Sequence, residues 1–265
     1  TQTIGLIISD VSNVFFSTLA KGVEDSCRSQ GWNLILCNTN DKHERDMSYI
    51  QVLANKGIDG ILFCMARDSD KKKTEESIQL LKKLKIPFVM IDRYLEEADC
   101  SSVIVDHKQG GYAAVKYLLG HGHRKIGCVT GPSGLEDSME RLIGYKKALE
   151  EYHISFRDEF IYEGNYDRES GAGAVDFFEG KEISAVFAFN DMSAYGVYNS
   201  LKKRGISVPG GMSLIGYDDI FFSEILDVPL TTVKQPIYEM GVESVKQLID
   251  EVESGVGARK CIVFQ

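Results

Sequence analysis

Short apolar runs alternate along the chain with longer stretches in which apolar residues recur every three or four positions. A short continuous apolar run is typical of a strand that is buried on both faces of a parallel sheet. Runs of this kind are found at 4–8, 34–37, 60–64, 88–91, 103–105, 126–130, 185–189 and 214–216. Their alternation with helix-length stretches predicts an α/β fold with parallel sheets and right-handed crossovers.

The stretches between these runs have the spacing of amphipathic helices. Leu19, Val23 and Cys27, for example, recur at four-residue intervals and would form one apolar face. Helices are predicted near 16–30, 43–56, 74–84, 108–120, 138–152, 168–179, 191–204 and 237–253.

A repeat is visible inside the chain. The pair at 4–5, Ile-Gly, recurs at 126–127, an offset of 122 residues, and Gly22 and Gly144 are separated by the same offset. The first strand, the following loop and the start of the first helix therefore have equal lengths in the two halves. Together with the matches further along, this predicts two similar α/β lobes.

The repeat also places two carboxylates at equivalent strand ends. The segment at 88–92 matches the segment at 214–218, and these segments end in Asp92 and Asp218. In open α/β sheets, ligands bind outside the carboxyl ends of the strands. If the lobes face each other, both carboxylates point into one cleft, so the pattern favours a two-lobed clamp around a ligand.

Composition and charge exclude several classes of protein. The 265 residues correspond to about two domains at roughly 150 residues each, and 43% hydrophobic with 26% charged residues is an ordinary globular composition. No apolar run approaches the roughly 18 residues that span a bilayer. The net charge of −9 argues against binding to phosphate backbones or anionic membranes by this chain alone.

The cysteines and the missing motifs narrow the chemistry further. Six cysteines stand singly, with no C-x-x-C pair, as expected of a reduced cytoplasmic protein. The chain has no P-loop, no H-E-x-x-H and no G-x-S-x-G motif. His121 and His123 lack a neighbouring ligand, and Asp218 and Asp219 point to opposite faces of a strand. We therefore expect no metal site, no cofactor and no enzymatic activity.

Five short sequence motifs follow one another along the chain. They are Asn-Val-Phe-Phe at 13–16, Val-Asp-His at 105–107, Phe-Asn-Asp-Met at 189–192, Ser-Leu-Ile-Gly-Tyr-Asp-Asp at 213–219 and Leu-Thr-Thr-Val-Lys-Gln-Pro at 230–236. In this order, the set resembles the effector-binding domain of LacI/GalR-family bacterial transcription regulators. The resemblance covers the chain from about residue 2 to its end.

The resemblance implies a type I periplasmic-binding-protein-like fold, with two doubly wound parallel-sheet lobes joined by three crossovers. The N-terminal lobe would hold 1–104 plus 236–258, and the C-terminal lobe 105–234 plus 260–265. The family's N-terminal helix-turn-helix has no counterpart in this sequence. DNA would therefore be bound only through that missing region of the full-length protein.

The resemblance also carries ligand-binding roles over to individual positions. These positions are Phe15, Phe16, Asp92, Arg141, Tyr166, Asn190, Asp218 and Gln235. The residue types suit a sugar, because carboxylates accept from its hydroxyls, Arg and Asn donate, and an aromatic ring stacks on its apolar face. Two plainer interpretations stay open: the phenylalanines belong to the core, and Asp92 pairs with Arg93.

Three functions follow from this comparison, in order of preference. The first is the sugar-binding effector domain of a cytoplasmic, DNA-binding repressor, in which the bound ligand closes the lobes and changes operator binding. The second is a periplasmic sugar-binding protein of an uptake system, which shares the fold. The third, an enzyme of the doubly wound class, lacks any nucleophile with a neighbouring base.

A homodimer is the partner that the resemblance implies besides the effector. Tyr195, Ile225 and Leu226 fall at positions that family members use for subunit contacts. The segment at 221–228 is apolar although it lies outside the predicted sheet, and a two-fold partner would cover it. Packing inside the lobe is the alternative for each of these residues.

Overall fold

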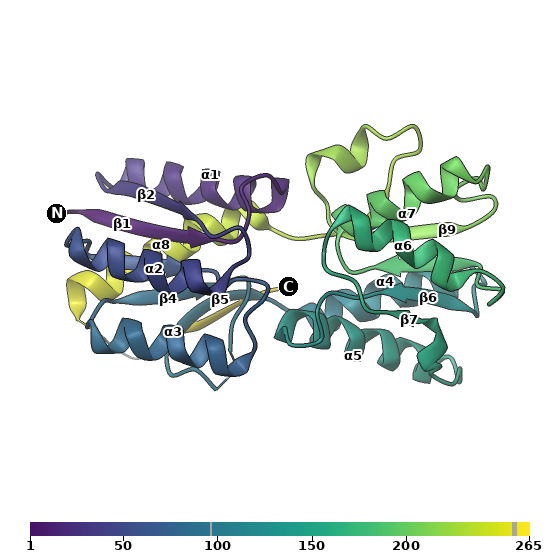
Figure 1. The fold of residues 1–265 in the computed structure, drawn as a ribbon, viewed down its shortest axis with the longest axis horizontal. Helices are drawn as coiled ribbons and strands as arrows, with labels where there is room; N and C mark the ends of the chain where they lie inside the picture. The colour runs from purple at the N-terminus through teal and green to yellow at the C-terminus, as the bar shows by residue number, and fades with distance from the viewer. Residues whose placement is uncertain (96, 256–258) are drawn as a thin grey trace. The chain divides into compact units, whose positions relative to one another are not determined.

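The computed structural model describes residues 1–95, 97–255 and 259–265. They form two compact units (Figure 1). Unit 1 comprises Thr1–Val105, Gly134–Glu136 and Pro236–Gln265, and unit 2 comprises Asp106–Ser133 and Asp137–Gln235. Unit 1 thus joins the two ends of the chain, which appear in purple and yellow.

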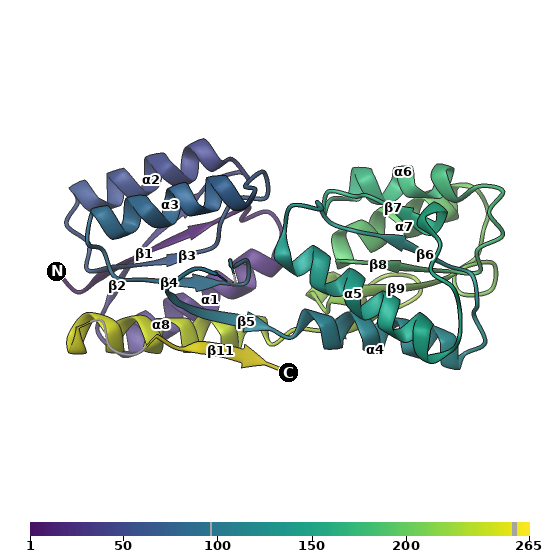
Figure 2. The same cartoon turned by 90° about the horizontal axis from the view of Figure 1, so that it is seen from below.

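Unit 1 is built on a parallel sheet of six strands in the order β11-β5-β4-β3-β1-β2. The strands are β1 (Thr3–Ile8), β2 (Asn33–Asn38), β3 (Gly60–Phe63), β4 (Phe88–Ile91), β5 (Ser101–Val105) and β11 (Cys261–Phe264). The helices are α1 (Val14–Ser29), α2 (His43–Asn55), α3 (Lys71–Lys83) and α8 (Ile237–Ser254). Figure 2 shows α2 and α3 on one face of the sheet and α1 and α8 on the other.

Unit 2 is built on a parallel sheet of five strands in the order β10-β9-β8-β6-β7. The strands are β6 (Ile126–Val129), β7 (Ile161–Tyr162), β8 (Ala185–Ala188), β9 (Ser213–Asp218) and β10 (Thr231–Lys234). The helices are α4 (His107–Gly120), α5 (Glu136–Glu151), α6 (Arg168–Phe178) and α7 (Asp191–Lys203), with 3-10 turns η1 (Asp158–Phe160) and η2 (Phe221–Glu224). In the part of the chain that the structure describes, no helix is both long and apolar enough to cross a bilayer.

The two sheets have the same topology, which confirms the predicted pair of similar lobes. Reading from β5 to β2 in unit 1 and from β10 to β7 in unit 2, the strands follow one another in the same order. All residues of β3, β4, β6 and β8 are buried, as their continuous apolar runs predicted. The fold is therefore of the type I periplasmic-binding-protein-like class.

The repeated glycines mark equivalent helix contacts. A Cβ on Gly22 of α1 would lie 2.2 Å from the carbonyl oxygen of Tyr238 on α8, and a Cβ on Gly144 of α5 would lie 2.2 Å from that of Lys108 on α4. Real Cβ atoms do not come this close to a carbonyl oxygen. Only glycine therefore permits these two helix pairs to pack at this distance, and both halves of the repeat use it.

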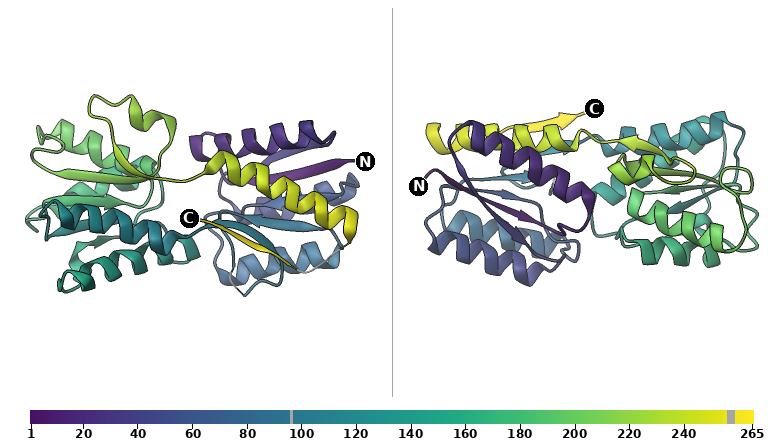
Figure 3. Two further views of the ribbon diagram at one scale, coloured as in Figure 1. Left: turned by 180° about the vertical axis from the view of Figure 1, so that it is seen from behind. Right: turned by 90° about the horizontal axis from the view of Figure 1, so that it is seen from above.

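The last strand corrects one expectation. The segment at 260–265 was expected in the C-terminal lobe, but β11 pairs with β5, so that Cys261 lies opposite Ser102 and Phe264 opposite Val105. Figure 3 shows β11 beside β5 near the C-terminus. Because β11 follows α8, which packs on the unit 1 sheet, the open edge of β5 is the nearest edge for it to join. The placement in the second lobe, with a crossing between α8 and the last strand, is therefore wrong.

Two edge strands of unit 2 have no counterpart among the predicted apolar runs. They are β7, with only two residues, and β10, whose sequence Thr-Thr-Val-Lys is half-exposed. An edge strand with an exposed face needs no continuous apolar run, so its hydrogen-bond pairing is visible only in the folded sheet. The expected burial of Cys37, Cys64 and Cys128 is confirmed.

Candidate functional site

Asp92 follows β4 at the carboxyl end of the unit 1 sheet. Its φ of 64° lies in the left-handed region, and its N–H donates to the carbonyl of Val103 at 3.0 Å. The residue is buried. A non-glycine residue held in this region costs about 1–3 kcal/mol, and such strain concentrates at functional positions. The strand thus presents this carboxylate at its end, as the repeat predicted.

Arg93, the next residue, is buried within the same unit. Its Nη1 donates to Ser9 Oγ at 2.7 Å, to Asp41 Oδ1 at 3.0 Å and to the carbonyl of Met65 at 3.2 Å. The guanidinium also lies 5.4 Å from the centre of the Phe16 ring. Arg93 Nη1 thus forms an ion pair with Asp41 at 3.0 Å, and the interpretation in which Asp92 pairs with Arg93 stays open beside it.

The carboxylate of Asp41 forms ion pairs with two arginines, Arg93 and Arg67. Burial acts to raise the pKa of its carboxyl group, but Arg93 and Arg67 outweigh burial and hold the pKa below its ordinary value. Arg67 Nε lies 3.5 Å from Asp41 Oδ2, and the Arg67 N–H donates to Asp41 Oδ1 at 2.9 Å. Asp41 is therefore ionised and fixes the guanidinium of Arg93 in place.

The two phenylalanines stand at the start of α1. The helix begins after Asn13, whose side-chain oxygen accepts from the Phe15 N–H at 3.0 Å. Phe15 and Phe16 are both buried, and their rings meet edge to face at 5.1 Å. Phe16 thereby forms an apolar wall beside the buried arginine Arg93, whereas Phe15 packs as a core residue.

A further buried carboxyl group of unit 1 interacts with the charge of Arg93. Asp46 of α2 is fully buried, and its Oδ2 accepts from the Ala66 N–H at 2.9 Å. Burial raises the pKa of this carboxyl group to about 7, although the Ala66 hydrogen bond and Arg93 act to lower it. Its Oδ1 has no hydrogen-bond partner among the described residues.

Arg141 is the buried arginine of unit 2, as Arg93 is of unit 1, but it lies on helix α5. Its Nη1 donates to the carbonyl of Phe189 at 2.6 Å and to the Tyr166 hydroxyl at 3.4 Å. The guanidinium lies 4.1 Å from the centre of the Tyr217 ring, and Asp137, one turn earlier, is 3.9 Å away. Arg141 is buried, so one carboxylate, one carbonyl and two aromatic rings surround its charge.

His107, the first residue of α4, completes this network. Its Nδ1 lies 3.4 Å from Arg141 Nε and 3.2 Å from the Tyr217 hydroxyl. Burial, reinforced by the charge of Arg141, lowers the pKa of His107 to about 3. Because a guanidinium only donates, Nδ1 is the acceptor and the proton of the neutral ring is on Nε2. That nitrogen has no hydrogen-bond partner among the described residues.

Tyr166 and Asn190 are joined at the same end of unit 2. Asn190 caps α7, because its Oδ1 accepts from the Ser193 N–H at 2.9 Å, and its Nδ2 donates to the Tyr166 carbonyl at 2.9 Å. Tyr166 is buried at a φ of 59°, and its hydroxyl donates to Asp137. Asn190 thus holds the strained backbone of Tyr166, and both residues belong to the expected ligand-binding set.

Asp218 ends β9, at the position equivalent to Asp92. It is buried and has a φ of 121°. Its Oδ1 accepts from Gln235 Nε2 at 2.7 Å, and the Gln235 N–H donates to the Asp218 carbonyl at 3.2 Å. Gln235 is also buried, and its Oε1 has no hydrogen-bond partner within the described chain.

The expected ligand-binding residues therefore divide between the two units. Phe15, Phe16 and Asp92 belong to unit 1, and Arg141, Tyr166, Asn190, Asp218 and Gln235 belong to unit 2. Two buried residues of these networks, Arg93 and His107, were not in the expected set. The sequence could have indicated Arg93 by its place directly after a strand-end aspartate, and His107 by its place in the Val-Asp-His motif.

The expected dimer residues have different environments. Tyr195 is buried, with its hydroxyl 2.9 Å from Ser223 Oγ, which in turn donates to Asp191 at 2.7 Å. Ile225 is 60% exposed, and Leu226 is half-buried. Tyr195 thus positions the segment that carries the other two, through hydrogen bonds within unit 2.

In the described ranges, no group of three or more His, Cys, Asp or Glu side chains is placed to hold a metal ion. The polar groups gathered at the two strand ends are hydrogen-bond donors and acceptors beside aromatic rings.

Comparison with known proteins decides the family. The family model described as periplasmic binding proteins and sugar binding domain of the LacI family matches residues 1–262. The chain belongs to the LacI family. A relative of this LacI-family domain, the HTH-type transcriptional repressor PurR of Vibrio atlanticus, is 39% identical over 256 residues, which are 96% of this chain and 75% of that protein.

Solved structures of LacI-family proteins agree with this assignment. A LacI family transcriptional regulator from Enterococcus faecium with bound ribose has a TM-score of 0.88 and 32% identity, covering 99% of this chain and 94% of that one. The transcriptional regulator CelR in complex with cellobiose has a TM-score of 0.90 and 25% identity, covering 100% and 82%. The LacI-family homologues of this effector domain are thus regulators.

Proposed function

We propose that this effector domain binds a small sugar of the ribose type and that binding controls the DNA affinity of a full-length repressor. The observation that carries the proposal is the pair of equivalent strand-end carboxylates, Asp92 and Asp218, each accompanied by a buried arginine. Carboxylates accept from vicinal hydroxyls and arginines donate to ring and hydroxyl oxygens, which is the chemistry that a sugar needs.

The remaining groups suit the same ligand. Phe16 and Tyr166 offer ring faces beside Arg93 and Arg141, respectively. Gln235 holds Asp218 with its amide nitrogen and keeps its buried Oε1 for a further hydroxyl donor. The ribose in the Enterococcus faecium regulator, at 32% identity, supports a pentose as the first sugar to test.

The repressor relatives favour a regulator over the periplasmic uptake protein that the sequence left as the alternative. A regulator of this family works in the cytoplasm and turns over no substrate, and we propose both for this protein. Its role is to convert the concentration of a free sugar into a change of operator occupancy.

Calorimetric titration with D-ribose tests the site. Asp218→Asn keeps the size of the side chain and tolerates the left-handed backbone, but it removes the charge. We expect it to weaken ribose binding by about 1–3 kcal/mol, or roughly 5- to 150-fold. Asp227→Asn is the control in the same unit, because Asp227 is exposed and pairs only with Lys202 among the described residues.

Two outcomes separate the sugar from the site. Wild-type affinity in Asp218→Asn would overturn the site. If ribose gives no binding heat, but another monosaccharide binds saturably and Asp218→Asn abolishes that binding, the site assignment holds and the sugar is a different one. The change of lobe angle stays a prediction, which small-angle X-ray scattering tests: the radius of gyration falls on addition of ribose, and an unchanged value contradicts it.

A homodimer is the second part of the proposal. Phe221, Phe222 and Ile225 are 65%, 44% and 60% exposed on a segment that Ser223 fixes through Asp191. A fixed, exposed apolar patch of this kind is typical of a protein interface. Sedimentation should show a dimer for the wild type and a monomer for Ile225→Asp, whereas Val52→Asp on α2 serves as the control and leaves the dimer intact.

A further inference from the structure

A cavity of about 340 Å³ lies in unit 2 at the opposite end of the sheet from Asp218. It is formed where β6 begins, whereas the effector residues follow the carboxyl ends of the strands. The buried side chains of Ile126, Leu149 and Phe160 form its apolar lining. A volume of this size is within the range of small-molecule sites.

Cations surround this apolar lining. Arg124, Lys125 and Arg157 line the cavity, and none of the described residues that line it is acidic. This local charge is opposite in sign to the net charge of −9 of the whole chain. An anionic group with an apolar body therefore complements both parts of the cavity.

Two of the three cations have ion-pair partners that compete only weakly with a ligand. Lys125 pairs with Glu182 at 2.7 Å and Arg157 with Glu159 at 2.7 Å, and the carboxylate side chains of these pairs are 80% and 51% exposed. Exposed ion pairs contribute little to stability, so exchanging one for a ligand anion costs little.

The arginines of the cavity are also held in orientation. Arg124 Nη1 donates to the carbonyls of Leu119 and His123, both at 2.9 Å. The guanidinium of Arg157 lies 4.9 Å from the centre of the Phe160 ring. These contacts engage one nitrogen or one face of each group and keep the charge at the cavity.

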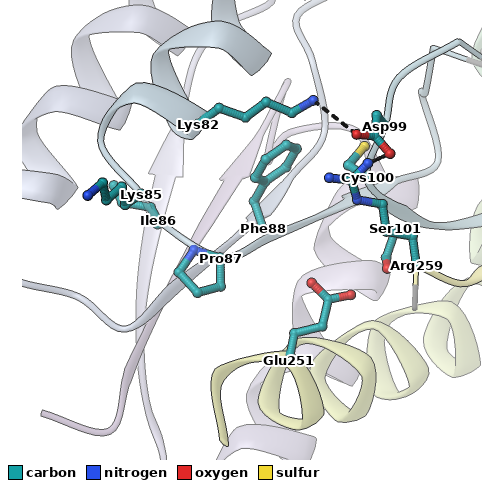
Figure 4. A pocket seen from close by; sticks show the side chains of 10 residues that line it. All are labelled: Lys82, Lys85, Ile86, Pro87, Phe88, Asp99, Cys100, Ser101, Glu251 and Arg259. Atoms are coloured by element: carbon teal, nitrogen blue, oxygen red, sulfur yellow. Dashed lines mark ion pairs between the residues drawn. The ribbon is translucent and has the colours of Figure 1, made fainter. Parts of the chain in front are cut away.

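A cavity in unit 1 provides a contrast. It lies beside Phe88 and holds Lys82 and Arg259, but Asp99 pairs with both of these cations (Figure 4). Glu251 lines the same cavity. Two carboxylates thus line this cavity beside its three cations, which include Lys85, whereas none of the described residues lining the cavity of unit 2 carries a carboxylate.

We propose that the cavity of unit 2 is a second ligand site, which binds a small organic anion with an apolar body, such as an aryl phosphate or aryl carboxylate. The anion lies among Arg124, Lys125 and Arg157, and the body contacts Leu149 and Phe160. The proposal is independent of the sugar proposed above, because the two sites share no residue.

Calorimetric titration of the full chain with phenyl phosphate is the test, with phenol and inorganic phosphate as the two halves of the probe. We expect saturable binding of phenyl phosphate at least tenfold tighter than that of either half. Arg124→Gln combined with Arg157→Gln should weaken it at least tenfold. The control is Arg204→Gln, an arginine of unit 2 outside the cavity that pairs with Asp176, and it should stay within twofold of the wild type.

Three results would overturn the proposal. They are no saturable binding of phenyl phosphate, equal affinity for phenyl phosphate and inorganic phosphate, and an equal response of the double variant and the control. Arg124→Lys combined with Arg157→Lys keeps both charges, and retention of most of the affinity by this variant, together with unchanged circular dichroism, attributes the loss to charge rather than to misfolding.

Discussion

Each lobe buries one arginine near a strand-end aspartate, but the two arginines reach that position from different elements. Arg93 comes directly after Asp92 in the loop that follows β4, whereas Arg141 projects from the second turn of α5. Arg93 is neutralised by Asp41 at 3.0 Å, and Asp41 is shared with Arg67. The nearest carboxylate of Arg141 that the structure places in an ion pair, Asp137, is 3.9 Å away.

The difference teaches that one topology accommodates two ways of burying a cation. In unit 1, Arg93 has a carboxylate of Asp41 within hydrogen-bond distance. In unit 2, the closest groups around Arg141 are the carbonyl of Phe189 at 2.6 Å and the ring of Tyr217 at 4.1 Å. The duplicated fold thus fixes where the strand ends lie, and the side chains around them have diverged.

Replacing each buried arginine by methionine tests this difference between the lobes, with the largest expected change in the free energy of unfolding. Arg141→Met removes the buried donor to the Phe189 carbonyl and the Tyr166 hydroxyl, and should lower the free energy of unfolding by about 3–5 kcal/mol. Arg93→Met should cost only about 1–3 kcal/mol, because Asp41 keeps Arg67 as its cation. Urea unfolding followed by circular dichroism measures both.

The control for this pair is Arg28→Met, since the Arg28 side chain is 70% exposed and its loss should change stability by less than about 0.5 kcal/mol. Equal costs for the two buried arginines, or a larger cost for Arg93, would show that the two lobes do not differ in how they neutralise the buried charge.

The lobes also differ in their buried titratable groups. In unit 1, Asp46 has a pKa of about 7, raised from 3.8 chiefly by burial. In unit 2, His107 has a pKa of about 3, lowered from 6.5 by burial and by Arg141. Both groups are neutral in the folded state over the window between pH 4 and pH 6, and each becomes charged on unfolding.

The two groups therefore give pH dependences of opposite sign. Folded Asp46 binds a proton that the unfolded chain releases between about pH 4 and 7, so its contribution to stability is lost as the pH rises through this window. The unfolded chain protonates His107 between about pH 6.5 and 3 while the folded protein does not, so stability is lost as the pH falls. Each effect amounts to about 1 kcal/mol per pH unit.

Paired variants isolate these contributions. The stability of the wild type relative to Asp46→Asn should decrease from pH 4 to pH 7, and that relative to His107→Gln should decrease from pH 6.5 towards pH 3. Chemical denaturation at a series of pH values gives both differences. If the two differences had the same slope, one of the two burial assignments would be wrong.

Two asparagines that cap helices offer the smallest contrast. Asn13 caps α1 by accepting one N–H, whereas the buried Asn190 caps α7 and also donates to the Tyr166 carbonyl. Asn13→Ala should cost about 1 kcal/mol, the usual value of a cap. Asn190→Ala should cost about 2–3 kcal/mol, because a buried carbonyl loses its partner as well. Thermal unfolding of the two variants should rank them in this order.

The sequence by itself determined the architecture. Apolar runs and helical spacing predicted the eight α-helices of the described residues and the central strands, because burial on both faces of a sheet requires a continuous apolar run. The equal spacing of Ile4-Gly5 and Ile126-Gly127 predicted the duplicated lobe, and with it the equivalence of Asp92 and Asp218, because equal element lengths bring equivalent residues to equivalent strand ends.

Only the tertiary structure decided how the charges at those ends are held and where the last strand pairs. The partners of Arg93, Ser9 and Asp41, are 84 and 52 residues away, and His107 meets Tyr217 across 110 residues. Strand β11 is half-exposed, so no apolar pattern assigns it to an edge, and its hydrogen bonds to β5 do so in the folded sheet. A buried charge or an open sheet edge is satisfied by whichever groups folding brings near, and the local pattern does not encode that proximity.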